Sequence, residues 1–176
     1  RLTAVDCDFT ENIATTTSDP YGGAGIYAIS STLDFQDSRF ESNNSGQDGG
    51  AALLNSGNAS FVSCEFNENA AGWAGGAIYT ISGAYVKIDR CVLNGNSAAY
   101  GGAINNYAGS SLVATNSLVI NNVALVNGGA IHNHSAFLSL IGCTVADNTA
   151  GTSGDGIRYN LGHSVYINSC IFRNGG

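Results

Sequence analysis

The sequence predicts an all-β chain folded as a single-stranded parallel β-helix, a solenoid of about six to seven coils of 26–27 residues with three short strands per coil. Two observations predict this fold. The tetrapeptide GGAI recurs at a nearly fixed spacing, since Ile78 to Ile104 is 26 residues and Ile104 to Ile131 is 27. In phase with it, apolar residues alternate with polar ones over short segments, which is the period of a strand. A propeller blade would need four strands in about 40 residues, so a solenoid fits better.

The first strand of each coil follows a pair of glycines. The clearest pairs are Gly75 and Gly76, Gly101 and Gly102, and Gly128 and Gly129; weaker copies of the motif occupy 22–26, 49–52 and 154–157. We expect the glycines to form a corner that needs positive φ torsions. The residues after them should stack as a buried ladder of Ile26, Ala52, Ile78, Ile104, Ile131 and Ile157. The motif is therefore interpreted as structural.

The other two strands of each coil lie around the pattern C/S-x-F/L/V-x-x-N. An apolar pair such as Val86 and Ile88 precedes each copy and predicts one strand, and the pattern itself predicts the other. Its asparagines form one column: Asn12, Asn43, Asn69, Asn96, Asn122 and Asn148. We expect this column to serve a second corner, because asparagine tolerates the left-handed region and stacked amides can hydrogen-bond from coil to coil.

Together the two motifs resemble the repeat pair GGA(I/L/V) and FxxN of chlamydial polymorphic membrane proteins and related bacterial right-handed β-helix surface proteins. The FxxN copies are residues 9–12, 40–43 and 66–69, and the resemblance covers nearly the whole chain. In later coils Leu93, Val119 and Val145 replace the phenylalanine. The resemblance implies a right-handed β-helix that acts in adhesion as a secreted or surface-displayed autotransporter passenger.

Composition agrees with an extracellular or bacterial cell-surface rod. Charged residues make up 11% of the chain, the net charge is −7, and there are only six Lys and Arg residues, so nucleic acid is not expected as a partner. No apolar run is long enough for membrane insertion. Because the chain has no methionine and begins with Arg1, we expect one β-helix domain over residues 1–176 that is a fragment or processed piece of a longer chain.

Five cysteines share one ladder position: Cys7, Cys64, Cys91, Cys143 and Cys170. Ser38 and Ser117 fill the other two rungs of this ladder. Stacked residues have parallel Cβ vectors about 4.8 Å apart, whereas a disulfide needs Cβ atoms about 3.8 Å apart. We therefore expect free, buried thiols instead of disulfides or a zinc site.

A candidate binding face follows the GGAI strand. If the isoleucines point inward, alternate neighbours point outward, and the tyrosine, histidine and arginine residues among them are the candidate binding residues: Tyr27, Tyr79, Tyr107, His132, His134 and Arg158. Such residues suit a protein or glycan on a host or neighbouring cell, although aromatic residues also simply suit an exposed sheet. His132 and His134 form an i, i+2 pair, but no third ligand is evident. We expect no metal and no cofactor.

The solenoid class also hosts pectate lyases and polygalacturonases, so a carbohydrate-active enzyme is one alternative. A hydrolase needs convergent carboxylates. The nearest candidates are Asp6 and Asp37, beside the column of Asp8, Arg39 and Glu65. That column alternates in sign, as an ion ladder on a solvated face does. We expect no catalytic residues and no enzymatic activity.

A further alternative is a structural subunit that stacks end to end into a filament or stalk. Core position Leu2 lies beside one end and Asn174 beside the other, which predicts uncovered terminal coils and axial self-association. An insertion at residues 15–21, which contains the only proline, is interpreted as either a functional loop or a tolerated insertion. The leading hypothesis remains a non-catalytic, adhesin-like rod.

Overall fold

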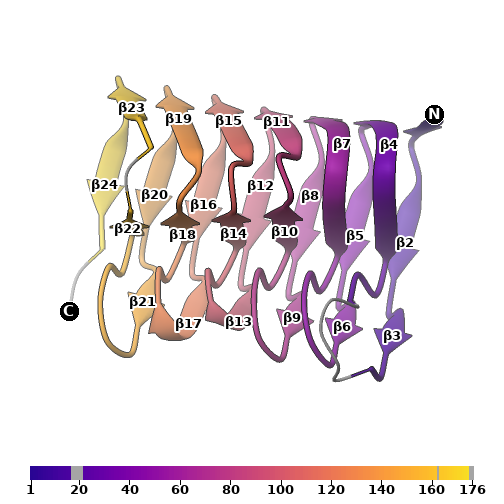
Figure 1. Ribbon diagram of the computed structural model, residues 1–176, viewed down its shortest axis with the longest axis horizontal. Coiled ribbons are helices and arrows are strands. Elements are labelled where there is room, and N and C mark those ends of the chain that lie inside the picture. Colours follow the sequence, from indigo (N-terminus) through magenta and orange to yellow (C-terminus); the bar gives the residue numbers. More distant parts are fainter. Residues whose placement is uncertain (17–21, 162, 175–176) are drawn as a thin grey trace.

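The molecule is a stack of coils, and strands are the only regular secondary structure in the part that the structure describes (Figure 1). The structure is a computed structural model that describes residues 1–16, 22–161 and 163–174. One sheet contributes one strand to each of seven coils, and neighbouring strands pair in parallel. The predicted all-β parallel β-helix is confirmed. Residues 17–21 of the insertion lie outside the described part.

Three sheets form the walls of the stack. The eleven-stranded sheet holds β1 (Leu2–Val5), β4 (Ile26–Gln36), β7 (Ala52–Val62), β10 (Ile78–Ile81), β11 (Tyr85–Asp89), β14 (Ile104–Tyr107), β15 (Ser111–Thr115), β18 (Ile131–His134), β19 (Phe137–Ile141), β22 (Ile157–Asn160) and β23 (Val165–Asn168). The seven-stranded sheet holds β2 (Asp8–Thr10), β5 (Arg39–Glu41), β8 (Glu65–Asn67), β12 (Val92–Asn94), β16 (Leu118–Ile120), β20 (Thr144–Ala146) and β24 (Ile171–Arg173). The six-stranded sheet holds β3 (Ile13–Ala14), β6 (Asn44–Ser45), β9 (Ala70–Ala71), β13 (Ser97–Tyr100), β17 (Val123–Asn127) and β21 (Thr149–Ala150).

The strands of the six-stranded sheet were not predicted from the sequence. Each follows the asparagine column, and several have only two residues, which is too short to show an alternating pattern. The strand of the GGAI motif and the strand of the apolar pair belong to one sheet, because β4 and β7 run through both positions without a break. In the next coil, a turn at residues 82–84 separates these two strands as β10 and β11, and the later coils have a break at the equivalent place.

Equivalent residues of successive coils pair directly, so the sequence repeat becomes a spatial ladder. Ile78 pairs with Ile104, and Ile104 pairs with Ile131. One irregularity falls where β13 pairs β17, where the register shifts between Ala98 and Tyr100. This shift accommodates the one extra residue between Ile104 and Ile131 while the glycine corners stay aligned.

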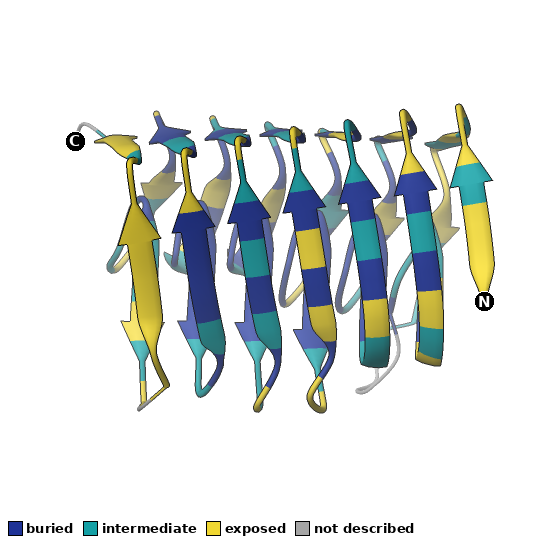
Figure 2. Cartoon of the chain, turned by 90° about the horizontal axis from the view of Figure 1, so that it is seen from above, coloured by how far each residue is buried: buried dark blue, intermediate teal, exposed yellow. Residues whose placement is uncertain are grey.

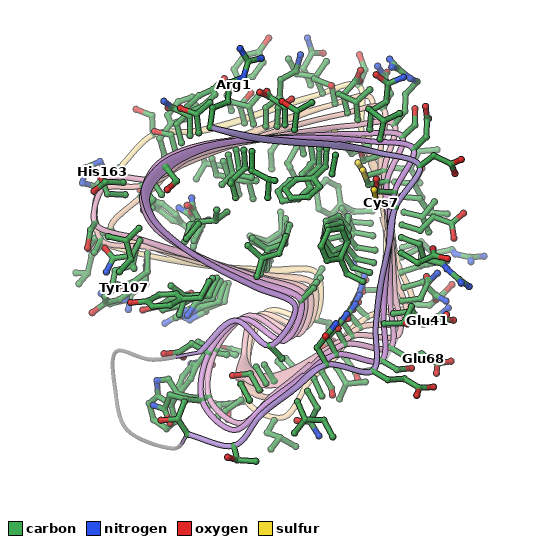
Figure 3. All side chains as sticks on the ribbon, turned by 90° about the vertical axis from the view of Figure 1, so that its right-hand side faces the viewer. Arg1, Cys7, Glu41, Glu68, Tyr107 and His163 are labelled. Atoms are coloured by element: carbon green, nitrogen blue, oxygen red, sulfur yellow. The ribbon has the colours of Figure 1, made fainter. Side chains whose placement is uncertain are left out.

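Stacked aromatic rings fill the core of the first coils (Figure 3). The ring centroids of Phe9 and Phe40 lie 4.8 Å apart, and those of Phe40 and Phe66 lie 4.7 Å apart. Leu93 and Val119 occupy the same column in the following coils and are 0–1% exposed. Ladder stacking therefore buries large apolar side chains in the inner coils. Each fully buried side chain stabilises the fold by about 1.5–3 kcal/mol.

The asparagine column forms a continuous amide ladder. Asn69 donates from Nδ2 to Oδ1 of Asn96 at 2.9 Å, and Asn96 donates in the same way to Asn122 at 2.9 Å. The expectation that these asparagines supply the left-handed residue is wrong, because the positive φ belongs to the residue before each of them, such as Glu68 at 55°. The corner torsion and the amide ladder are thus divided between two adjacent positions.

The two end coils expose side chains that inner coils bury (Figure 2). β23 is exposed along its whole length, whereas the neighbouring β19 is mostly buried. Ile167 pairs with the fully buried Leu140, yet is 46% exposed. The apolar column therefore reaches the last coil uncovered.

Candidate binding groove

A groove of about 490 Å³ runs along one side of the stack. Seen along the axis in Figure 3, each coil bends inward ahead of its GGAI strand, and Tyr107 lies beside the resulting notch. The groove is lined by Gln47, Asp48, Trp73, Tyr79, Ile81, Tyr100, Asn105, Tyr107 and His132. We call this surface the notch groove.

The wall of the notch groove comes from residues just before the glycine pairs. In successive coils this position is held by Asp48, Ala74, Tyr100, Asn127 and Ser153, which pair with one another in that order. Trp73 precedes Ala74 and stands 52% exposed beside Tyr100. This wall was not predicted from the sequence, although each glycine pair follows a residue that differs from coil to coil, which is the one signal that could have indicated it.

The floor of the notch groove comes from the strands after the glycine pairs. Tyr79 pairs with Asn105, and Asn105 pairs with His132, which places one residue each from β10, β14 and β18 in a row. These side chains face away from the core, but they are only 9%, 5% and 7% exposed. The expectation of an openly exposed sheet is wrong at these positions, because the wall covers the floor.

The structure brings together only some of the predicted binding residues. Tyr79, Tyr107 and His132 line the notch groove. His134 lies beside it, with its ring centroid 4.9 Å from that of Tyr107. Two others do not line it: Tyr27, which is 38% exposed on β4, and Arg158, which lies on β22.

Aromatic rings connect the wall to the floor. The centroids of Trp73 and Tyr100 are 5.0 Å apart, and those of Tyr100 and His132 are 5.5 Å apart. His132 is 5.9 Å from His134, which contacts Tyr107 in turn. This arc of rings offers a ligand both flat apolar faces and polar edges.

The electrostatic character of the notch groove is neutral to acidic. Among the described residues, Asp48 is the only acidic one in the lining, and no lysine or arginine lines the groove. Burial, followed by the nearby His134 and Arg158, lowers the pKa of His132 to about 4. His132 is therefore an uncharged imidazole at neutral pH.

Other candidate sites have structural explanations. Asp6 and Asp37 both have positive φ, at 54° and 47°, and so form a corner of the stack. On the solvated face, Arg39 forms an ion pair with Asp8 of the neighbouring coil at 3.1 Å, as the predicted ion ladder requires, but its second ion pair, at 2.9 Å, is with Glu41 of its own strand and not with Glu65. Within the described residues, no three His, Cys, Asp or Glu side chains are placed to hold a metal ion.

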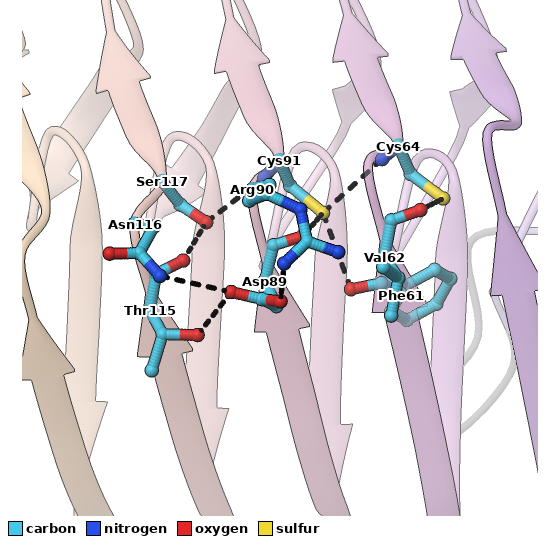
Figure 4. A network of polar contacts seen from close by, with 9 residues as sticks. All are labelled: Phe61, Val62, Cys64, Asp89, Arg90, Cys91, Thr115, Asn116 and Ser117. Carbon is cyan, nitrogen blue, oxygen red and sulfur yellow. Dashed lines mark hydrogen bonds and ion pairs between the residues drawn. The ribbon is translucent and has the colours of Figure 1, made fainter.

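The side chains of the cysteine ladder form hydrogen bonds to backbone carbonyl groups (Figure 4). All five cysteines are free thiols. The Cys64 thiol donates to the carbonyl of Val62 at 3.4 Å, and the Ser117 hydroxyl donates to the carbonyl of Thr115 at 2.7 Å. Cysteine and serine therefore play the same part, each bonding a carbonyl two residues back. Burial raises the pKa of Cys143, which disfavours a reactive thiolate.

Comparison with known proteins places the chain in a family. Residues 3–145 match the family model described as the right handed beta helix region. No curated protein and no solved structure gives a match. None of the described residues forms a helix long and apolar enough to cross a membrane. Because the family model covers more than half of the chain, this protein belongs to the right-handed β-helix family.

Proposed function

We propose that this chain is a non-catalytic, extracellular rod on a bacterial surface, adhesin-like in role, which uses the notch groove to bind a molecule on a host or neighbouring cell. The observation that carries the proposal is Trp73, a large aromatic side chain that is 52% exposed beside a partly open groove. The core does not need this residue. Exposed aromatic side chains beside a concavity are typical of binding sites.

The scaffold suits this role, because the groove is assembled from several coils. Wall residues such as Trp73 and Tyr100 belong to different coils, and the floor strands β10, β14 and β18 belong to three. Parallel ladders and the amide column fix these coils relative to one another. A rigid groove loses little entropy on binding. The resemblance of the GGAI and FxxN repeats to chlamydial surface adhesins supports the same role.

The lining residues favour binding over catalysis. Hydrolysis of a glycosidic bond usually uses two carboxyl groups, and the groove lining has one, from Asp48. In the described part of the chain, no lysine or arginine that could act as the base of a lyase lines the groove. These features support a groove that holds its ligand unchanged.

Cell binding tests the proposal. The fluorescently labelled chain should bind cultured epithelial cells saturably, and Trp73→Ala together with Tyr100→Ala should reduce binding at least tenfold. Tyr85→Ala is the matched control, because Tyr85 is 42% exposed on β11 and does not line the groove. If the double variant Trp73→Ala, Tyr100→Ala bound cells as well as the control Tyr85→Ala does, the notch groove would be excluded as the binding site. Release of reducing ends from polygalacturonate, or of unsaturated products from pectin or alginate, would show that the groove is catalytic.

A second role, as a structural subunit that stacks end to end, is supported by one observation. Apolar side chains of the terminal coils, including Leu2, Ile167 and Phe172, are 43–46% exposed. Two copies of the isolated chain can cover these surfaces by axial contact. Both roles are compatible, because the notch groove lies on the side of the stack.

A further inference from the structure

Two side chains of the groove floor are buried without using all of their hydrogen-bonding atoms. Asn105 and His132 are 5% and 7% exposed, and neither Oδ1 of Asn105 nor Nδ1 of His132 has a hydrogen-bond partner among the described residues. A buried polar atom without a partner costs about 1–3 kcal/mol, and most native proteins avoid this. Both residues line the notch groove.

The neighbouring positions show that the strands can satisfy such groups when they serve only the fold. Asn106 and Asn133 each follow one of these residues in sequence and point into the core. Asn106 donates from Nδ2 to Oδ1 of Asn133, and Asn133 donates to the carbonyl of Ala136 at 2.7 Å. Within β14 and β18, the unpartnered atoms of Asn105 and His132 therefore belong to the side chains on the groove side, and not to those on the core side.

The chemistry of these atoms indicates what the molecule must offer. The amide oxygen of Asn105 can only accept a hydrogen bond, so the ligand must present donors. The aromatic faces of Trp73 and Tyr100 require in addition an apolar surface of ring size. A pyranose ring combines both features, because it carries C–H groups on a face and hydroxyl groups around its edge. The volume of about 490 Å³ lies in the range of about 300–1,000 Å³ that small-ligand sites occupy.

Charge narrows the class of sugar. The lining, as far as the structure describes it, contains the carboxyl group of Asp48 and no cationic side chain, and the whole chain has a net charge of −7. Arg158, the nearest cation to His132 along its ladder, donates to the carbonyl of Tyr159 at 3.2 Å and does not line the groove. Uronic acids, sialic acids and nucleotides would meet repulsion here.

We propose that the notch groove binds a neutral oligosaccharide, whose rings stack on Trp73 and Tyr100 and whose hydroxyl groups bond Asn105 and His132. This inference rests on the proposed binding role and names the class of ligand.

A glycan array tests the inference directly. The labelled 176-residue chain is applied to an array of neutral, sialylated and uronic acid-containing oligosaccharides, and isothermal titration calorimetry with the best neutral oligosaccharide follows. We expect retention of neutral members only. Trp73→Ala and Asn105→Leu should each weaken the calorimetric affinity at least tenfold, whereas Tyr85→Ala should leave it unchanged. Asn105→Leu removes the acceptor without breaking any bond of Oδ1 within the protein, and its unfolding midpoint in urea should match that of the parent chain.

Each outcome has a defined meaning. Retention of no neutral oligosaccharide, or stronger retention of acidic ones, would overturn the inference, as would unchanged affinity in Asn105→Leu. Cell binding that protease treatment of the cells abolishes and neutral glycosidases leave intact would indicate a protein ligand, which keeps the proposed binding role and rejects the glycan. Glycan retention without any cell binding would support the inference and reject the adhesin role.

Discussion

Asn105 and Asn106 are neighbours on β14, yet their side-chain amide groups differ in direction and in hydrogen bonding. Asn106 accepts from Oγ1 of Thr80 at 2.8 Å and donates to the carbonyl of Phe137 at 2.8 Å inside the core, whereas Oδ1 of Asn105 faces the groove without a protein partner. The alternation of a strand explains the difference in direction. It also separates a side chain that serves stability from one that we assign to binding.

This contrast predicts that the same substitution at two adjacent positions changes the free energy of unfolding by very different amounts. Asn106→Leu should destabilise the chain by roughly 3 kcal/mol, because it removes a bonded amide and leaves buried partners unsatisfied. Asn105→Leu should change the free energy of unfolding by less than about 1 kcal/mol. Urea denaturation followed by circular dichroism measures both. Equal destabilisation by the two variants would contradict the assignment of Asn105 to the groove.

The glycine corner predicts a second pair of results. A Cβ at Gly102 would lie 2.2 Å from the carbonyl oxygen of Gly129, so Gly102→Ala should cost roughly 3 kcal/mol or more. Gly109 has a positive φ, of +75°, but a Cβ there meets nothing within 4 Å. Gly109→Ala should cost only the torsional strain of about 1–2 kcal/mol. A Gly102→Ala variant as stable as Gly109→Ala would mean that the coils are packed less closely than described.

Much of this architecture can be predicted from the sequence, and the reason is the repeat itself. A spacing of 26 residues between Ile78 and Ile104 places the two side by side in any stack of coils, so the ladder requires no knowledge of the path between them. The inward bend before each glycine pair depends on two-residue strands such as β9 and on left-handed torsions at Glu68 and the equivalent residues of other coils. The residue type at these left-handed positions differs from coil to coil, so no sequence motif marks them. The wall of the notch groove, with Trp73 and Tyr100, was missed for this reason.

The pKa of His132 predicts that stability depends on pH. Its value of about 4 lies below the ordinary 6.5, because burial and then His134 and Arg158 disfavour the charged form. Between pH 6.5 and 4 the unfolded chain takes up a proton at His132 and the folded chain does not, so stability should fall as the pH falls through this window. The full loss is about 3 kcal/mol.

Urea unfolding at pH 7 and pH 4.5 checks this prediction, with His132→Gln as the comparison. The variant should lose less stability than the parent chain between the two values, because the residual dependence on pH then comes from carboxyl groups and the other histidines. The groups facing His132 are Tyr100, His134 on the same strand and Arg158 on β22, and all three remain in the variant. Parallel profiles for the two proteins would show that His132 is not buried in its neutral form.

The cysteine ladder predicts slow and selective labelling. Cys64, Cys91 and Cys143 are 0–1% exposed, whereas Cys7 and Cys170 in the end coils are partly exposed. A thiol reagent should therefore modify Cys7 and Cys170 first in the folded chain, and all five after denaturation without reductant. Mass spectrometry of the labelled peptides gives the order. Recovery of intact Cys64–Cys91 and Cys143–Cys170 disulfides would contradict the free-thiol ladder.

The exposed core columns of the end coils predict that the isolated 176-residue chain associates along its axis. Phe172 continues the column of the fully buried Val145, yet it is 43% exposed, and Leu2 at the opposite end pairs with the buried Leu33, yet it is 45% exposed. Covering these faces with a second copy removes apolar area from water and pairs the free strand edges. Sedimentation velocity should show an association that increases with concentration into the high micromolar range. Phe172→Lys should weaken it, because the charge would be buried at the junction, whereas Tyr166→Lys should not, because Tyr166 on β23 pairs with Ser139 outside the apolar column. A chain that stays monomeric throughout this range, with no fibres in electron micrographs, would show that its terminal coils do not stack on one another.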